Sequence, residues 1–311
     1  MTKKHVPAID TPAALMLILL AAVWGGSFFF AEVALTHVPP MTITLHRVVW
    51  ALPILYLVVR QQGIPMPRGV RIWGSYLVMG ALNNAIPFTL IFWGQVRIES
   101  GLASILNGTT AVFGAVIAGV LLVDEPLLPR KIVGAVLGLI GVAVILGLDA
   151  VTRFTPKNLA QLAVLAAALS YAFASVWGKT ALAGQPPVMN AFGMLVGSTV
   201  LIIPVVIVVD GMPDLDLPAS VWASLIALAT LSTSLAYLLY FAILRRAGAA
   251  NLMLVTLMIP PFAILPGALF LGERIAPGGW IGFALIGLGL IVTDGRVMAR
   301  IKGNTLRGSG V

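Results

Sequence analysis

The chain of 311 residues contains ten apolar stretches, each long enough for a helix to cross a lipid bilayer. Such a helix needs about 20 mostly apolar residues. Strands of a membrane barrel are about half that length and alternate polar with apolar residues, which these stretches do not. The stretches are 13–34, 41–59, 72–93, 101–123, 131–148, 158–178, 188–209, 220–243, 250–271 and 278–294. They predict an all-α integral membrane protein with ten transmembrane helices.

The composition excludes most soluble classes. Hydrophobic residues make up 59% of the chain and charged residues 10%, whereas a soluble domain has about 45–50% and about 25%. The net charge of +8 would suggest a nucleic-acid partner in a soluble chain, but here the basic residues lie between apolar stretches. The chain has no cysteine, so disulfides and thiol catalysis are excluded. We expect no enzyme activity, cofactor, bound metal or nucleic-acid partner, and lipid as the surroundings.

The basic residues also predict the orientation. With ten spans, one set of loops and tails holds 14 Lys and Arg residues and the other set holds 4. Because basic loops stay in the cytoplasm, both tails, 1–12 and 295–311, are expected to be cytoplasmic. The linker 149–157 is then external.

The two halves of the chain resemble each other. Shifting the sequence by 148 positions places Glu125 on Glu273 and Pro129 on Pro277. The repeats run over 13–148 and 158–294 with five spans each, so the second enters the membrane inverted. Inverted repeats around a central cavity are typical of secondary transporters, which bind substrate near the midplane.

Several motifs are similar to those of the drug/metabolite transporter superfamily, in its EamA-type branch. They are Trp24-Gly25-Gly26-Ser27-Phe28, Leu45-His46-Arg47, Leu121 to Pro126, Ile259-Pro260-Pro261-Phe262 and Leu269 to Arg274. The resemblance covers nearly the whole chain and implies a bacterial inner-membrane exporter of small amphipathic metabolites. Amino acids are the first expectation, with YddG-type aromatic amino acid exporters as the preferred match. The family usually has a proline midway in the fourth span, where this chain has Asn107 to Ala111.

The energy source and two other functions stay open. The acidic residues lie in loops or near span ends, and Glu32 is the nearest to a span interior. Pumps commonly place an acid inside the bundle, so facilitated diffusion or exchange is favoured, although His46 titrates near neutral pH. The alternatives are a proton-coupled efflux pump for organic cations and a membrane sensor without transport. Carriers of sugar phosphates should have several basic residues inside the bundle, and Arg47 is the single candidate.

Polar and aromatic residues inside the spans are the candidates for substrate binding, because such groups usually face the bundle interior. They are Trp24, His46, Asn83, Asn84, Asn107, Tyr171, Trp177, Tyr237 and Asn251. Structural alternatives exist for some of them: Asn83 or Asn84 can bond the backbone that Pro87 frees, and Trp24 can sit at the interface. Arg47 either extends to water or binds a substrate carboxylate.

Proline and glycine positions suggest where helices bend. Pro87, Pro260 and Pro261 remove backbone hydrogen bonds, and Gly108 lies where the family proline is missing. We expect these four residues to act as hinges. Paired glycines such as Gly193 and Gly197 allow close helix contact, within the bundle or in a dimer, so the oligomeric state stays open.

Overall fold

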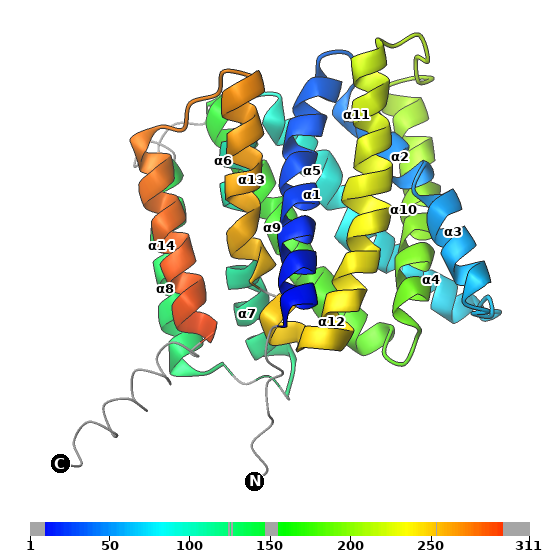
Figure 1. Ribbon diagram of the computed structural model, residues 1–311, viewed down its shortest axis with the longest axis horizontal. Helices are drawn as coiled ribbons and strands as arrows, with labels where there is room; N and C mark the ends of the chain where they lie inside the picture. Colours follow the sequence, from blue (N-terminus) through cyan, green and yellow to red (C-terminus); the bar gives the residue numbers. More distant parts are fainter. Residues whose placement is uncertain (1–9, 124, 126, 147–154, 253, 295–311) are drawn as a thin grey trace.

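Helices built from the predicted spans stand side by side in the computed structural model (Figure 1), which describes residues 10–123, 125, 127–146, 155–252 and 254–294. In this part of the chain eight helical segments are long and apolar enough to cross a membrane. Two shorter apolar helices, Val255–Phe270 and Pro277–Thr293, complete the ten. The tails and most of the 149–157 linker lie outside the described residues.

The first half contains five spans, three of which are interrupted. Its helices are α1 (Thr11–Leu35), α2 (Pro40–Val49), α3 (Leu52–Gln61), α4 (Val70–Gly80), the π-helix η1 (Ala81–Ala85), α5 (Ile86–Gln95), α6 (Ser100–Asn107), α7 (Thr110–Leu121) and α8 (Pro129–Leu146). The pairs α2–α3 and α6–α7 each form one span, and α4, η1 and α5 form another.

The second half repeats this plan. It consists of α9 (Pro156–Ala181), α10 (Pro187–Val209), α11 (Ala219–Ala229), the π-helix η3 (Thr230–Leu235), α12 (Ala236–Leu252), α13 (Val255–Phe270) and α14 (Pro277–Asp294). Helix α1 begins and α14 ends at the lower face in Figure 1. We call this face the terminal face and the other the opposite face.

Local sequence explains where helices begin. Proline opens α2, α8, α9, α10 and α14, at a position where its missing N–H is not needed. Asp10 caps α1 by accepting a hydrogen bond from the Ala13 N–H at 3.0 Å. Arg246 and the Ala13 N–H both stabilise the charged form of this carboxyl and lower its pKa.

Irregular helical turns occur at matching positions in the two halves. Shifting η1 by 148 residues gives 229–233, which overlaps η3 at Thr230–Leu235. Gly108 separates α6 from α7, and Leu254 lies in a turn directly before α13 begins. Within α12, Gly248 has φ +79° and interrupts the helix, so residues 249–252 are a separate short helical piece, and α13 is shorter than the predicted 250–271 span. The predicted ten-helix fold with two inverted five-helix repeats is confirmed.

Side chains account for the wide turns. Pro87 is the second residue after η1, and its missing N–H removes one α-helical bond. In η3 the hydroxyl groups of Thr233 and Ser234 donate to the carbonyl oxygens five residues earlier, Leu228 and Ala229. These bonds help satisfy backbone groups inside the bilayer, where water cannot.

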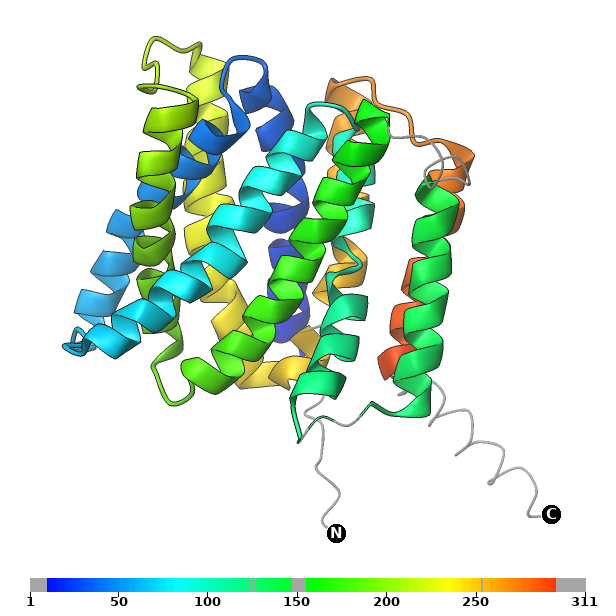
Figure 2. The ribbon, with the colours of Figure 1, turned by 180° about the vertical axis from the view of Figure 1, so that it is seen from behind.

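Glycine brings helices together within the bundle. Helices α4 and α10 are in contact where a Cβ on Gly193 would meet the Tyr76 ring. Helices α8 and α14 pair at one edge of the bundle (Figure 2), and a Cβ on Gly134 or Gly141 would meet the backbone of α14. These glycines therefore serve packing inside the molecule.

Candidate functional site

Arg47 lies inside the bundle, and its side chain does not extend to water. It is 6% exposed and lies three to four residues from the middle of its span, Pro40–Gln61. Its Nε donates to Thr233 Oγ1 at 3.0 Å and its Nη2 to the Ser232 carbonyl oxygen at 3.2 Å. The guanidinium therefore joins the second span to the π-turn of the eighth.

A second polar contact joins the halves at the other π-turn. The Tyr237 hydroxyl donates to Asn84 Oδ1 at 2.9 Å, and Asn83 Nδ2 donates to the Tyr237 hydroxyl at 3.3 Å. Asn84 is fully buried and is 3.5 Å from Ser198 Oγ in the middle of α10. Asn83 and Asn84 thus contact side chains of the other half, beyond any role near Pro87.

Aromatic residues at the same depth extend this region. The hydroxyl groups of Tyr171 and Tyr237 lie within electrostatic range of Arg47. Trp24 contacts Tyr240, with ring centroids 6.0 Å apart. Asn83, Tyr171 and Tyr237 each keep part of their surface accessible although they lie mid-span. We call Arg47, Asn83, Asn84, Tyr171 and Tyr237 the central polar cluster.

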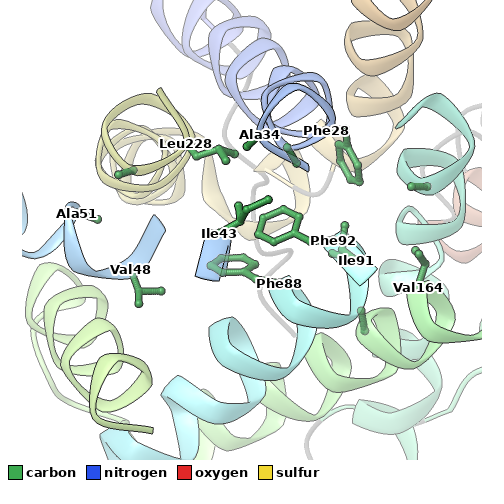
Figure 3. Packing of buried hydrophobic residues seen from close by; sticks show 14 of the residues in the cluster. Phe28, Ala34, Ile43, Val48, Ala51, Phe88, Ile91, Phe92, Val164 and Leu228 are labelled. Carbon is green, nitrogen blue, oxygen red and sulfur yellow. The ribbon is translucent and has the colours of Figure 1, made fainter. Parts of the chain in front are cut away.

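Apolar side chains fill the space between this cluster and the opposite face. Phe28, Ile43, Phe88, Phe92 and Leu228 are at most 5% exposed. Figure 3 shows them directed toward one another from α1, α2, α5 and α11. All five belong to the half of their span that ends at the opposite face. These residues, which we call the apolar plug, close that face above the cluster.

A carboxylate at the opposite face also joins the halves. Glu273 accepts hydrogen bonds from the Ser100 N–H at 2.9 Å, the Ser100 hydroxyl at 2.8 Å and the Gly101 N–H at 3.3 Å. A carboxylate is favourable at a helix N-terminus, here that of α6, because the N–H groups there lack partners. Its repeat counterpart Glu125 instead pairs with Lys179 at 2.7 Å.

Five predicted binding residues lie outside the central polar cluster: Trp24, described above, and four others. His46 accepts a bond from Trp50 Nε1 at 3.0 Å and packs against Trp222. Trp177 Nε1 donates to the Ser75 carbonyl oxygen, and Asn251 Nδ2 to that of Ala247. Asn107 ends α6 with a buried Oδ1 that has no partner in the described structure.

The predicted hinges occupy different settings. Pro87 borders η1, and Gly108 makes the turn between α6 and α7. Pro260 and Pro261 lie within α13, which remains helical around them. The neighbouring Phe262 approaches Gly25 of α1, so closely that a Cβ at Gly25 would clash with it. The role of all four as hinges stays a prediction.

A cavity of about 370 Å³ lies at the opposite face, away from the cluster. Glu99, Lys157, Gln161 and Arg274 contribute its polar side chains. Leu146 and Thr155, which flank residues 147–154, also line it. The predicted central cavity is a separate feature and stays a prediction.

Sequence reasoning did not find the partners of Arg47. Thr233 and Phe88, which contact Arg47, and Ser198, which contacts Asn84, were not among the predicted residues. Arg47 itself had a clear signal, since it is the one basic residue within the predicted spans away from their ends. Only the packing of the second span on the eighth shows what it contacts.

Comparison with known families and proteins agrees with this architecture. The model of the EamA-like transporter family matches twice, at residues 11–147 and 158–293. A solved structure with 20% sequence identity has the same fold, with a TM-score of 0.65 over 93% of this chain and 99% of that chain.

Curated relatives match along nearly their whole lengths. The uncharacterized transporter YoaV of Bacillus subtilis is 25% identical, over 89% of this chain and 94% of that protein. A probable amino-acid metabolite efflux pump of Escherichia coli is 25% identical, over 89% and 93%. A probable terminal-alkyne amino-acid exporter of Streptantibioticus cattleyicolor is 25% identical, over 91% and 94%. The chain therefore belongs to the EamA-like transporter family, within the drug/metabolite transporter superfamily, and is a multi-pass membrane transporter of small molecules.

Proposed function

We propose that this transporter exports small amphipathic metabolites, chiefly amino acids including aromatic ones, across the bacterial inner membrane by alternating access. The observation that carries the proposal is the central polar cluster. Arg47 contacts Thr233, and Asn83 and Asn84 contact Tyr237, so both repeats contribute to one polar region at mid-depth. Substrate sites of inverted-repeat transporters lie near the midplane between the repeats.

The difference between the two faces supports alternating access. At the opposite face Glu273 of the second repeat bonds the N-terminus of α6 in the first. A shift of 148 residues places Ser100 and Gly101 at residues 248 and 249, so the equivalent partner of Glu125 would lie there, where Gly248 breaks the helix. Glu125 instead pairs with Lys179. In the proposed cycle the Glu273 contact opens while Glu125 forms the equivalent contact, so the faces close in turn.

Orientation and repeat bounds complete this proposal. The repeats are 13–148 and 158–294, joined by an external linker at 149–157, and both tails are cytoplasmic. Pro87, Gly108, Pro260 and Pro261 provide the bending. With this orientation the apolar plug faces the outside, so in the proposed cycle this state takes up substrate from the cytoplasm.

The relatives named for amino-acid metabolites and amino acids support the proposed substrate class. The cluster offers hydrogen-bond donors from Arg47 and Asn83, and aromatic surface from Tyr171 and Tyr237. A proton-coupled pump for organic cations is the second candidate. Such a pump would need an acidic residue beside the substrate. Glu32, the nearest acidic candidate, instead accepts a hydrogen bond from Gln95 Nε2 at 3.2 Å, where the third span ends at the opposite face.

Counterflow in proteoliposomes tests the proposal. Labelled phenylalanine, tryptophan, threonine and a tetraalkylammonium cation are each followed with and without a pH gradient. We expect exchange of the aromatic amino acids at rates that the gradient does not change. Gradient-driven accumulation of the cation alone would contradict the proposal.

A further inference from the structure

We propose that Arg47 is the binding site for a substrate carboxylate, and that the site accepts amphipathic monocarboxylates that lack an amino group. The inference rests on the proposed transport function and specifies the chemical class of its substrates. The carboxylate is the required group, and the apolar body supplies the rest of the binding.

The hydrogen bonds of Arg47 leave room for a ligand. A guanidinium has five N–H donors in a fixed plane, and Arg47 uses two of them, on Thr233 and on the Ser232 carbonyl oxygen. The other three have no partner among the described residues, although the residue is only 6% exposed. A carboxylate can take two parallel N–H groups of a guanidinium at once, so these donors suit an anionic ligand.

The surroundings fix the guanidinium in place before a ligand arrives. Its central carbon lies 3.8 Å from the centre of the Phe88 ring and 5.9 Å from that of Phe92. Stacking on an aromatic face suits an arginine cation, and the two hydrogen bonds set its rotation. The Tyr171 hydroxyl lies within electrostatic range and can donate a further bond to an anion.

No protein carboxylate neutralises this cation in the described structure. Asp10 and Glu125 pair with Arg246 and Lys179 at the terminal face. Asp210 bonds Thr42, and Glu273 bonds Ser100, at the opposite face. Because an unpaired charge inside the bundle is unfavourable, a bound carboxylate would stabilise the site by pairing with Arg47.

The lack of a carboxylate beside Arg47 among the described residues also explains why the substrate needs no amino group. An ammonium group at this depth would meet only neutral acceptors such as the Asn83 amide, because Arg47 has no acidic neighbour among the described residues. A zwitterion would therefore leave a net positive charge in the site, whereas a simple monocarboxylate would leave none. The site therefore requires the carboxylate and gains nothing from the amine.

A purely structural role for Arg47 makes a different prediction. As a clamp between the second and eighth spans, it would affect the binding of all ligands alike. The test therefore compares ligands that differ in one group. 3-Phenylpropionate lacks the amine of phenylalanine, and phenylalanine amide lacks its carboxylate.

In proteoliposomes both compounds compete with labelled phenylalanine for exchange. A neutral hydrogen bond is worth no more than about a tenfold change in affinity, and bonds to a charged group about ten- to a hundredfold. We therefore expect 3-phenylpropionate to compete within about tenfold of phenylalanine, and the amide to be weaker by more than that. If the amide competes as well as 3-phenylpropionate while phenylalanine exchanges, the inference is wrong and the transport proposal stands.

Binding to the detergent-solubilised protein gives a second readout that needs no transport. We expect 3-phenylpropionate to raise the melting temperature of the wild type and of the control R60Q, whose arginine is exposed on the same span, but not of R47Q. R47K, which keeps the charge without the planar fork, replaces R47Q if that variant does not fold. Stabilisation of the Arg47 variants equal to that of the wild type would overturn the inference. Selective stabilisation without any phenylalanine exchange would support the site and refute the transport proposal.

Discussion

Single side chains hold the two repeats together at the middle of the bundle. Tyr237 is the clearest case, since its hydroxyl accepts from Asn83 and donates to a fully buried Asn84. Arg47 makes the corresponding connection to Thr233. These contacts join the two repeats and also place polar groups at the depth where a substrate must pass.

Removing the Tyr237 hydroxyl should therefore weaken both the contact between the repeats and the polar region at mid-depth. Y237F leaves Asn84 Oδ1 buried without its donor, at a cost of about 1–3 kcal/mol. We expect a lower melting temperature in detergent and slower phenylalanine exchange. Y56F is the matched control, because Tyr56 is 43% exposed and its hydroxyl makes no hydrogen bond to any described residue. Equal behaviour of the two variants would show that the Tyr237 bonds contribute nothing.

Residue-level prediction from the sequence succeeded where depth alone decides the role. Asn83, Asn84, Tyr171 and Tyr237 are mid-span polar or aromatic residues, and the structure brings them near Arg47. His46 and Trp177 have the same sequence character, yet His46 bonds Trp50 of its own span and Trp177 bonds the Ser75 carbonyl oxygen of α4. The direction in which a helix turns each residue depends on packing between distant spans, which one sequence does not reveal.

At the scale of elements, close helix contacts depend on glycine at particular positions. A Cβ at Gly80 of α4 would clash with the backbone of α10 at Met194 and Ser198, whereas Gly74 of the same helix has no atom within 4 Å of that position. We expect G80A to destabilise the protein by about 1–3 kcal/mol through overpacking. G74A should leave the melting temperature unchanged or slightly higher. Thermal unfolding in detergent compares the two.

The proline pair of α13 offers a separate test of helix flexibility. P260A and P261A restore backbone hydrogen bonds and should stiffen the helix. We expect exchange to slow while the half-saturating concentration of phenylalanine stays nearly constant. P204A is the control, because Pro204 is an exposed residue inside α10, away from the proposed hinges. A large loss of affinity with normal turnover would instead assign the pair to substrate binding.

Elements were easier to predict than their interruptions. Apolar length predicted all ten spans, and the internal repeat predicted their pairing. The π-turns η1 and η3 had weaker signals, a proline in one half and hydroxyl residues in the other. The predicted 250–271 stretch corresponds to two pieces, the end of α12 and α13, as the fourth span corresponds to α6 and α7; apolar length alone did not reveal this division.

The whole molecule has one face closed by the apolar plug and by the Glu273 contact with α6. The proposed cycle requires these contacts to separate when substrate leaves. In contrast, a protein that only senses ligands would bind with this face permanently closed. The central claim is therefore that α6 and α13 move apart at the opposite face during transport.

A disulfide between these helices tests that claim directly. The chain has no native cysteine, and a Cβ placed at Gly267 would lie 2.9 Å from Ser100 Oγ. The two positions are thus close enough for the Cβ separation of about 3.5–4.5 Å that a disulfide requires. Phenylalanine exchange is measured for S100C/G267C before and after reduction, with the single variants S100C and G267C as controls. We predict background exchange in the oxidised double variant and recovery on reduction to the level of the G267C variant; full exchange by the oxidised, cross-linked protein would contradict the account.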